Sequence, residues 1–160
     1  MAIEEFDTPE GPVTRIAIAD GQLHFGGDSP VVSATGMTGF LVADSNGLAG
    51  QLEATASVLI PGVAIAGTTA LSINNTGELV VAGPFSDGSA VVTVPAGPYL
   101  RLDVLNGSLG VAGQTIQGDF ALENTTLSDG STVVRIAAGN VAASLAADAI
   151  TLVDGTGYFL

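Results

Sequence analysis

The sequence predicts an all-β protein, built as a meander in which each antiparallel hairpin follows the previous one. Three observations predict this fold class: residues alternate between apolar and polar, turn dipeptides recur at short intervals, and the last quarter of the chain restates its beginning. Hydrophobic residues make up 47% of the chain, but they include 6 Phe, 2 Tyr and no Trp, and 22 Gly interrupt them. Small and β-branched residues separated by glycine favour thin, closely spaced sheets over a bulky globular core.

Alternation of apolar and polar residues is typical of strands with one buried face and one solvated face. Shorter apolar runs indicate strands that are buried on both faces. The alternating segments are 52–58, 100–104 and 116–123, and the apolar runs are 91–94, 133–137 and 150–153. Residues 142–149 are the best helical candidate by propensity, but the matching region 23–31 contains two glycines and a proline, so both are expected to be strand–turn–strand.

Glycine dipeptides separate these segments. Asn-Gly and Asp-Gly tolerate the positive φ values that tight hairpins need, so they predict turns between strands. The predicted turns are Asp20-Gly21, Asn46-Gly47, Pro61-Gly62, Asn75-Thr76-Gly77, Asp87-Gly88, Asn106-Gly107, Asp129-Gly130 and Asp154-Gly155.

The sequence repeats itself with a period of about 119 residues. Residues 14–18 (TRIAI) return as 134–138 (VRIAA), and residues 39–42 (GFLV) return as 157–160 (GYFL), at offsets of 120 and 118. We therefore predict a single all-β module over residues 1–160 that holds about 1.35 copies of the unit, with 6–42 overlapping 120–160. A fixed period indicates that each unit packs beside a copy of itself.

Two arrangements of the hairpins fit this period. Either they form an elongated, solenoid-like or grooved repeat sheet, or each unit is a discrete β-sandwich joined to the next by a linker. No proline-rich or charged linker recurs at the repeat period, which favours the continuous sheet. Both ends of the chain lie within patterned segments, so we expect the edge strands to pair with copies of the chain or with neighbouring repeats.

The charge of the chain excludes one class of partner. Sixteen acidic residues face 3 arginines and no lysine, which gives a net charge of −13. Nucleic-acid binding depends on Lys and Arg that neutralise phosphates, so no nucleic-acid partner is expected.

No apolar run approaches the roughly 20 residues of a membrane-spanning helix, so no membrane insertion is expected either. The chain has no Cys and hence no disulfide or thiolate metal site.

The sequence holds no catalytic constellation, and we expect no enzyme. His24, the single histidine, lies in an alternating segment where a solvent-facing position is the simpler interpretation.

Calcium is the one cofactor that the composition suggests, because oxygen ligands are plentiful in the glycine-rich turns, although EF-hand spacing is missing. The candidate metal ligands are Asp44, Asn46, Asp87, Asp129 and Asp154. Tyr99 is a candidate binding residue that either stacks on a sugar or caps the edge of the core.

Several segments of the chain resemble the repeat units of very large bacterial surface proteins, the haemolysin-type or adhesin-like calcium-binding proteins. These segments are 94–102 (VPAGPYLRL), 111–123 (VAGQTIQGDFALE) and 133–138 (VVRIAA), together with 48–52, 60–63 and 71–77. The resemblance spans about residues 36–160 and implies a tandem, non-enzymatic, extracellular module with no assigned ligand or catalytic residue.

These observations lead to one functional hypothesis and an alternative. The hypothesis is a structural or adhesive repeat module of a large bacterial extracellular or cell-surface protein, which serves as spacer, stalk or fibre and assembles end to end. The alternative is a carbohydrate- or calcium-binding β module that recognises its ligand through turn-rich edges.

Overall fold

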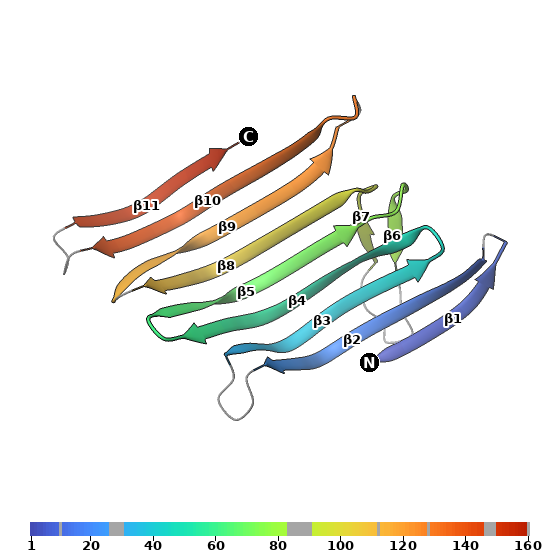
Figure 1. Cartoon of the computed structure of the whole chain (residues 1–160), viewed down its shortest axis with the longest axis horizontal. Helices are drawn as coiled ribbons and strands as arrows, with labels where there is room; N and C mark the ends of the chain where they lie inside the picture. Colours follow the sequence, from blue (N-terminus) through green and yellow to red (C-terminus); the bar gives the residue numbers. More distant parts are fainter. Residues whose placement is uncertain are drawn as a thin grey trace.

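The computed structural model of the chain is an antiparallel β structure (Figure 1). It describes residues 1–9, 11–25, 31–82, 91–111, 113–127, 129–145 and 150–159. These residues form strands and turns, with no helix among them. The strands are β1 (Ala2–Thr8), β2 (Gly11–Phe25), β3 (Val32–Asp44), β4 (Gly47–Ile60), β5 (Val63–Asn74), β6 (Val80–Ala82), β7 (Val92–Val94), β8 (Tyr99–Val111), β9 (Gln114–Thr126), β10 (Thr132–Leu145) and β11 (Ile150–Phe159).

Nine of the strands form one open sheet in the order β1-β2-β3-β4-β5-β8-β9-β10-β11, with every neighbouring pair antiparallel. The prediction of an all-β meander is confirmed. Figure 1 shows the nine strands side by side in one layer, with β1 and β11 at its two edges. Over the described residues, the second sheet is the two-stranded β6–β7 hairpin, so the alternative of a β-sandwich is wrong.

The turn predictions are correct at some positions and wrong at others. Asn46-Gly47 and Pro61-Gly62 connect β3 to β4 and β4 to β5, as expected. Asp20, Asn106 and Asp154 instead lie inside β2, β8 and β11, with φ of 53°, 51° and 54° at β-bulges where the register shifts. The positive φ that suits a hairpin turn also suits a bulge residue, so the dipeptide alone does not distinguish a turn from a bulge.

Strands β9, β10 and β11, which we call the second triplet, pair in the same register as β1, β2 and β3, the first triplet. Adding 119, 120 and 118 to residue numbers in β1, β2 and β3 converts the pairs of the first triplet into those of the second. The matching pairs are Glu4–Arg15 with Glu123–Arg135, and Ala17–Phe40 with Ala137–Tyr158. In this register, Ala2 in β1 and Ala121 in β9 are the first two paired residues that correspond to each other.

The bulges obey the same correspondence. Asp20 in β2 and Asn140 in β10 lie 120 positions apart and both have φ of 53°. Gly36 in β3 and Asp154 in β11 lie 118 positions apart, with φ of 61° and 54°. Because a bulge fixes which residues oppose each other across the ladder, the two triplets share both their register and the device that sets it.

The β6–β7 hairpin covers one face of the first triplet. Val94 in β7 is 1% exposed and packs with Phe40 (3%) and Ala17 (5%) into a buried apolar cluster. Val92 and Tyr99 pack against this cluster. The hairpin leaves the sheet after β5 and returns at β8, so β5 pairs directly with β8.

The side chain of Asn74, the last residue of β5, holds both legs of this hairpin. Its Nδ2 donates to the carbonyl oxygens of Glu78, before β6, at 2.8 Å, and of Pro95, after β7, at 2.7 Å. Its Oδ1 accepts from the backbone N–H and the hydroxyl of Thr76 at 2.8 and 2.7 Å. Asn74 is 1% exposed, so each lost bond leaves a buried polar group unpaired at a cost of roughly 1–3 kcal/mol.

Much of the sheet remains open to solvent. The chain exposes 9819 Å², whereas a compact protein of 15.8 kDa exposes about 7,300 Å². Part of the excess lies on β11, where Val153, Tyr158 and Phe159 are 71%, 75% and 74% exposed. The fold therefore leaves apolar surface uncovered at the β11 edge while the hairpin covers the corresponding surface of the first triplet.

We expect alanine to have opposite consequences at two corresponding positions. Phe40→Ala removes a buried ring beneath the hairpin and lowers the free energy of unfolding by about 3–5 kcal/mol. Tyr158→Ala removes an exposed ring and changes it by no more than about 0.5 kcal/mol. Urea unfolding of both variants measures the difference, and equal losses would contradict the view that the hairpin shelters Phe40 alone.

Candidate interaction surface

The face that carries the hairpin continues across the sheet as a row of cross-strand neighbours. Residues directly opposite each other on adjacent strands point to the same side of a sheet. The row runs through Phe40, Gln51, Ser72, Arg101, Glu123 and Arg135. All three arginines of the chain lie on the hairpin face: Arg101 and Arg135 at the β8–β10 end, and Arg15 in β2, two residues from Ala17.

The Glu123 carboxylate lies between the arginines of the two flanking strands. Arg135 approaches it at 3.5 Å and Arg101 at 3.8 Å, while Arg101 also forms a bidentate bond with Asp103 at 2.7 and 2.8 Å. The bond to Asp103 raises the pKa of Arg101 above its ordinary value. The arginine side chains are 42% and 46% exposed, so each pair is worth about 0–1 kcal/mol and serves mainly to set register.

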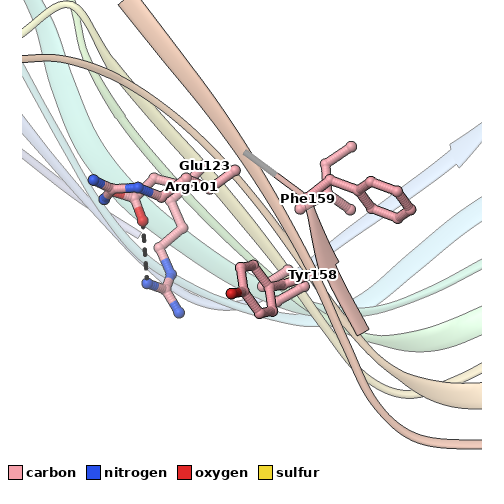
Figure 2. A pocket seen from close by; sticks show the side chains of 8 residues that line it. Arg101, Glu123, Tyr158 and Phe159 are labelled. Carbon is pink, nitrogen blue, oxygen red and sulfur yellow. Dashed lines mark ion pairs between the residues drawn. The ribbon is translucent and has the colours of Figure 1, made fainter. Parts of the chain in front are cut away.

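Beside this charged row, the second triplet forms a surface hollow of about 220 Å³, which we call the Tyr158 hollow. Its lining includes Arg101, Ala121, Glu123, Arg135, Ala137 and Tyr158. Figure 2 shows Tyr158 on the same side of β11 as Arg101 and Glu123, with Phe159 on the opposite side, as strand alternation requires. The hollow therefore has an apolar floor of two alanines, an aromatic wall at the sheet edge and a charged rim.

The candidate metal ligands Asp44 and Asn46 lie together in the β3–β4 turn. The Asp44 Oδ1 accepts from the backbone N–H groups of Asn46 at 2.7 Å and Gly47 at 3.1 Å. Both residues line a hollow of about 380 Å³ that also includes Glu78 at the base of the hairpin. The Asp44 carboxylate thus stabilises its own turn, which is the ordinary role of Asp in an Asp–x–Asn–Gly turn.

The other candidate metal ligands lie elsewhere in the fold. Asp129 accepts from the Ser131 hydroxyl at 2.6 Å and its N–H at 2.9 Å in the β9–β10 loop, and these bonds lower the pKa of Asp129. Four strand spacings, about 19 Å, separate this loop from Asp44. Asp154 is a bulge residue within β11, and Asp87 lies outside the described residues. The described part of the chain brings no three His, Cys, Asp or Glu together as a metal site, and calcium binding stays a prediction.

Tyr99 and His24 are the remaining candidate residues. Tyr99 begins β8 and packs against the cluster beneath the hairpin, where burial first and the Glu123 charge second raise the pKa of its hydroxyl. The sugar-stacking role of Tyr99 stays a prediction. His24 is exposed near the end of β2, opposite Ser33.

Sequence reasoning missed a polar cluster that joins three strands at their bulges. Asp119 in β9 accepts from the backbone N–H of Asn106 in β8 at 2.7 Å and from the Nδ2 of Asn140 in β10 at 2.6 Å. The cluster lines an open hollow of about 520 Å³. The available signal is the Asx residue before or near glycine in each strand, but it becomes readable only once bulges are distinguished from turns.

Comparison with protein-family models, curated proteins and solved structures finds no match for this chain. A search for apolar helices over the described residues finds none able to cross a membrane. The class that the fold itself defines is an open, single-layer antiparallel sheet with one covering hairpin.

The hydrogen bonds of Asp119 make the free energy of unfolding depend on pH in the acid range. The Asn106 backbone N–H and then the Asn140 amide hold the pKa of Asp119 below its ordinary value. A lowered folded-state pKa gives stability that is complete above the unfolded-state value near 3.9 and is lost as the pH falls through the folded value. We expect the free energy of unfolding to decline below about pH 4, with a shallower decline in Asp119→Asn.

Urea unfolding between about pH 2 and 7 measures this decline, and carbon-13 titration of the Asp119 carboxyl measures its pKa directly. A titration midpoint at or above the ordinary aspartate value would contradict the role of the two amides.

Proposed function

We propose that the chain is a non-enzymatic structural repeat module of a bacterial extracellular or cell-surface protein. In this proposal, successive units add strands to one continuous sheet, which serves as a spacer, stalk or adhesive fibre. The next unit supplies a β4-type strand to the open edge of β11, and the preceding unit supplies a β8-type strand to the open edge of β1. The family resemblance of the sequence is consistent with such a module.

The shared register of the two triplets is the observation that carries this proposal. Because β11 corresponds to β3 and β1 corresponds to β9, the neighbours of β3 and β9 specify what each edge strand accepts. β3 pairs with β4 and β9 pairs with β8. The pairing between units then repeats pairings that already exist within the unit, so it requires no new interface.

A glycine in β11 supports the same assignment. Gly39 in β3 has φ of 144°, and a Cβ there would collide with the Gln51 carbonyl of β4 and lie 2.9 Å from the Leu52 Cα. The corresponding Gly157 in β11 has no such φ, and a Cβ there would meet no described atom within 4 Å. Nothing among the described residues requires glycine at 157; glycine would be required there if β11, on pairing with a β4-type strand, takes the φ that Gly39 has beside β4.

Continuation of the sheet can be tested by appending a second copy of residues 43–126 directly after Leu160, the position that matches Val42. We expect the backbone amides of β11 to exchange more slowly with solvent than in the original chain, because a new strand occupies that edge. Amide hydrogen exchange measures the change. A scrambled extension of equal composition is the control, and equal exchange in both chains would refute the proposal.

Engineered cysteines can report the register of this pairing, since the chain has none of its own. Thr38 lies opposite Glu53, so Thr156 should lie opposite the appended copy of Glu53. We expect a disulfide between cysteines at these two positions, because opposed residues lie within disulfide reach. A cysteine at the appended copy of Ala54 points to the other face and should not form one; equal oxidation at both positions contradicts the register.

The glycine argument leads to a matched pair of alanine variants. Gly157→Ala should leave the original chain nearly unchanged, within about 0.5 kcal/mol. In the extended chain the same substitution should restore fast exchange of the β11 amides, because pairing as in β3 requires the φ of Gly39 at position 157, where a Cβ would collide with the incoming backbone. Gly39→Ala serves as the positive control, and a silent Gly157→Ala in the extended chain would remove this support.

A further inference from the structure

The site that the hairpin covers in the first triplet exists a second time, uncovered. Under the hairpin lie Ala17 and Phe40, which are 5% and 3% exposed, with Ala2 packed beside them. The corresponding residues of the second triplet are Ala137, Tyr158 and Ala121. Tyr158 is 75% exposed and Ala137 is also exposed, and all three line the Tyr158 hollow.

The covering element reaches toward the N-terminal side of its own unit. The β6–β7 hairpin arises between β5 and β8, lies over β4, and reaches β2 and β3 through Val94, which packs with Ala17 and Phe40. Asn74 holds the hairpin in this orientation through the carbonyls of Glu78 and Pro95. A hairpin anchored in the same way in a following unit would cross the β4-type strand beside β11 and arrive over β11 and β10.

We propose that the Tyr158 hollow is the docking site for the β6–β7-type hairpin of a following unit. This inference rests on the proposed function, and it adds a contact between faces to the pairing between edges. The residue of the next unit that corresponds to Val94 fills the hollow over Ala121 and Ala137, as Val94 does over Ala2 and Ala17. Each unit is then clasped by the hairpin of the next.

One substitution between the two sites fits this assignment. Phe40 is replaced at its corresponding position by Tyr158, whose hydroxyl needs a hydrogen-bond partner once it is covered. Figure 2 shows Tyr158 on the side of the sheet that carries Arg101 and Glu123. The charged row at the rim of the hollow therefore offers a polar partner that a phenylalanine would not use.

The test uses the chain extended with a second copy of residues 43–126. Replacing Tyr99 by Phe in both copies leaves Tyr158 as the single tyrosine, in a chain without tryptophan. Quenching of tyrosine fluorescence by acrylamide then reports the accessibility of Tyr158. We expect quenching severalfold weaker in the extended chain than in the original chain carrying Tyr99→Phe, because a docked hairpin buries the ring.

Variants of the appended hairpin identify what covers Tyr158. Aspartate at the appended position corresponding to Val94 should restore strong quenching, because a charge cannot be buried in the hollow without a partner. Aspartate at the position corresponding to Val81, which is 53% exposed in the first hairpin, is the matched control and should leave quenching weak. Alanine at the Val94 position, a milder change, should restore quenching in part if the aspartate variant disturbs folding of the extension.

Amide exchange of β11, measured in the same samples, separates this inference from the proposed function. Slow exchange with persistently strong quenching of Tyr158 overturns hairpin docking and leaves the continuous sheet intact. Fast exchange overturns the proposed function and this inference with it. In the original chain, quenching that weakens as the protein concentration rises would show that a second whole molecule covers Tyr158, which also overturns hairpin docking.

Discussion

The Asn74 amide is the interaction on which the tertiary structure depends most. A single-layer sheet has no interior of its own, so its buried apolar cluster exists only where the hairpin lies on it. Asn74 fixes that hairpin by bonding both of its legs and the intervening Thr76 with one buried side chain. The Nδ2 group of Asn74 donates two hydrogen bonds and its Oδ1 accepts two, all at 2.7–2.8 Å. Every donor and the acceptor of the amide therefore has a partner, and this network fixes the position of the side chain.

The remainder of the sheet is stabilised mainly by its backbone ladder. Continuous antiparallel pairing runs from β1 to β11, while large apolar side chains such as Leu59, Phe159 and Val153 remain exposed. Exposed apolar surface of this extent is typical of surfaces that meet a partner. The uncovered aromatic at position 158 and the covered one at position 40 differ in surroundings rather than in backbone register. What the second triplet lacks is the neighbouring strand and hairpin that the first triplet has.

The sequence predicted the architecture better than the contacts. Alternation and the 119-residue period were sufficient for the meander and for the correspondence of Arg15 with Arg135, because both depend on residue spacing alone. The excursion of β6–β7 out of the sheet was not predictable, since a run such as Val92–Val94 reads the same in a sheet and in a covering hairpin. Asn74 reads as an ordinary turn residue until its partners are known, and the Tyr158 hollow follows only from comparing covered and uncovered copies.

The offsets of 119, 120 and 118 show where the repeat tolerates change. The segment that joins the paired residues Asp7 and Pro12 is one residue shorter than the corresponding segment between Thr126 and Thr132, yet the strands on either side keep their register. A slip of one residue would turn every side chain of a strand to the opposite face, so the register must be set within the strands themselves. Bulge residues at corresponding positions, such as Asp20 and Asn140, provide this. If further units continue this sheet, as we propose, a register set by the strands themselves allows only one alignment, and that alignment would bring the next hairpin over Tyr158.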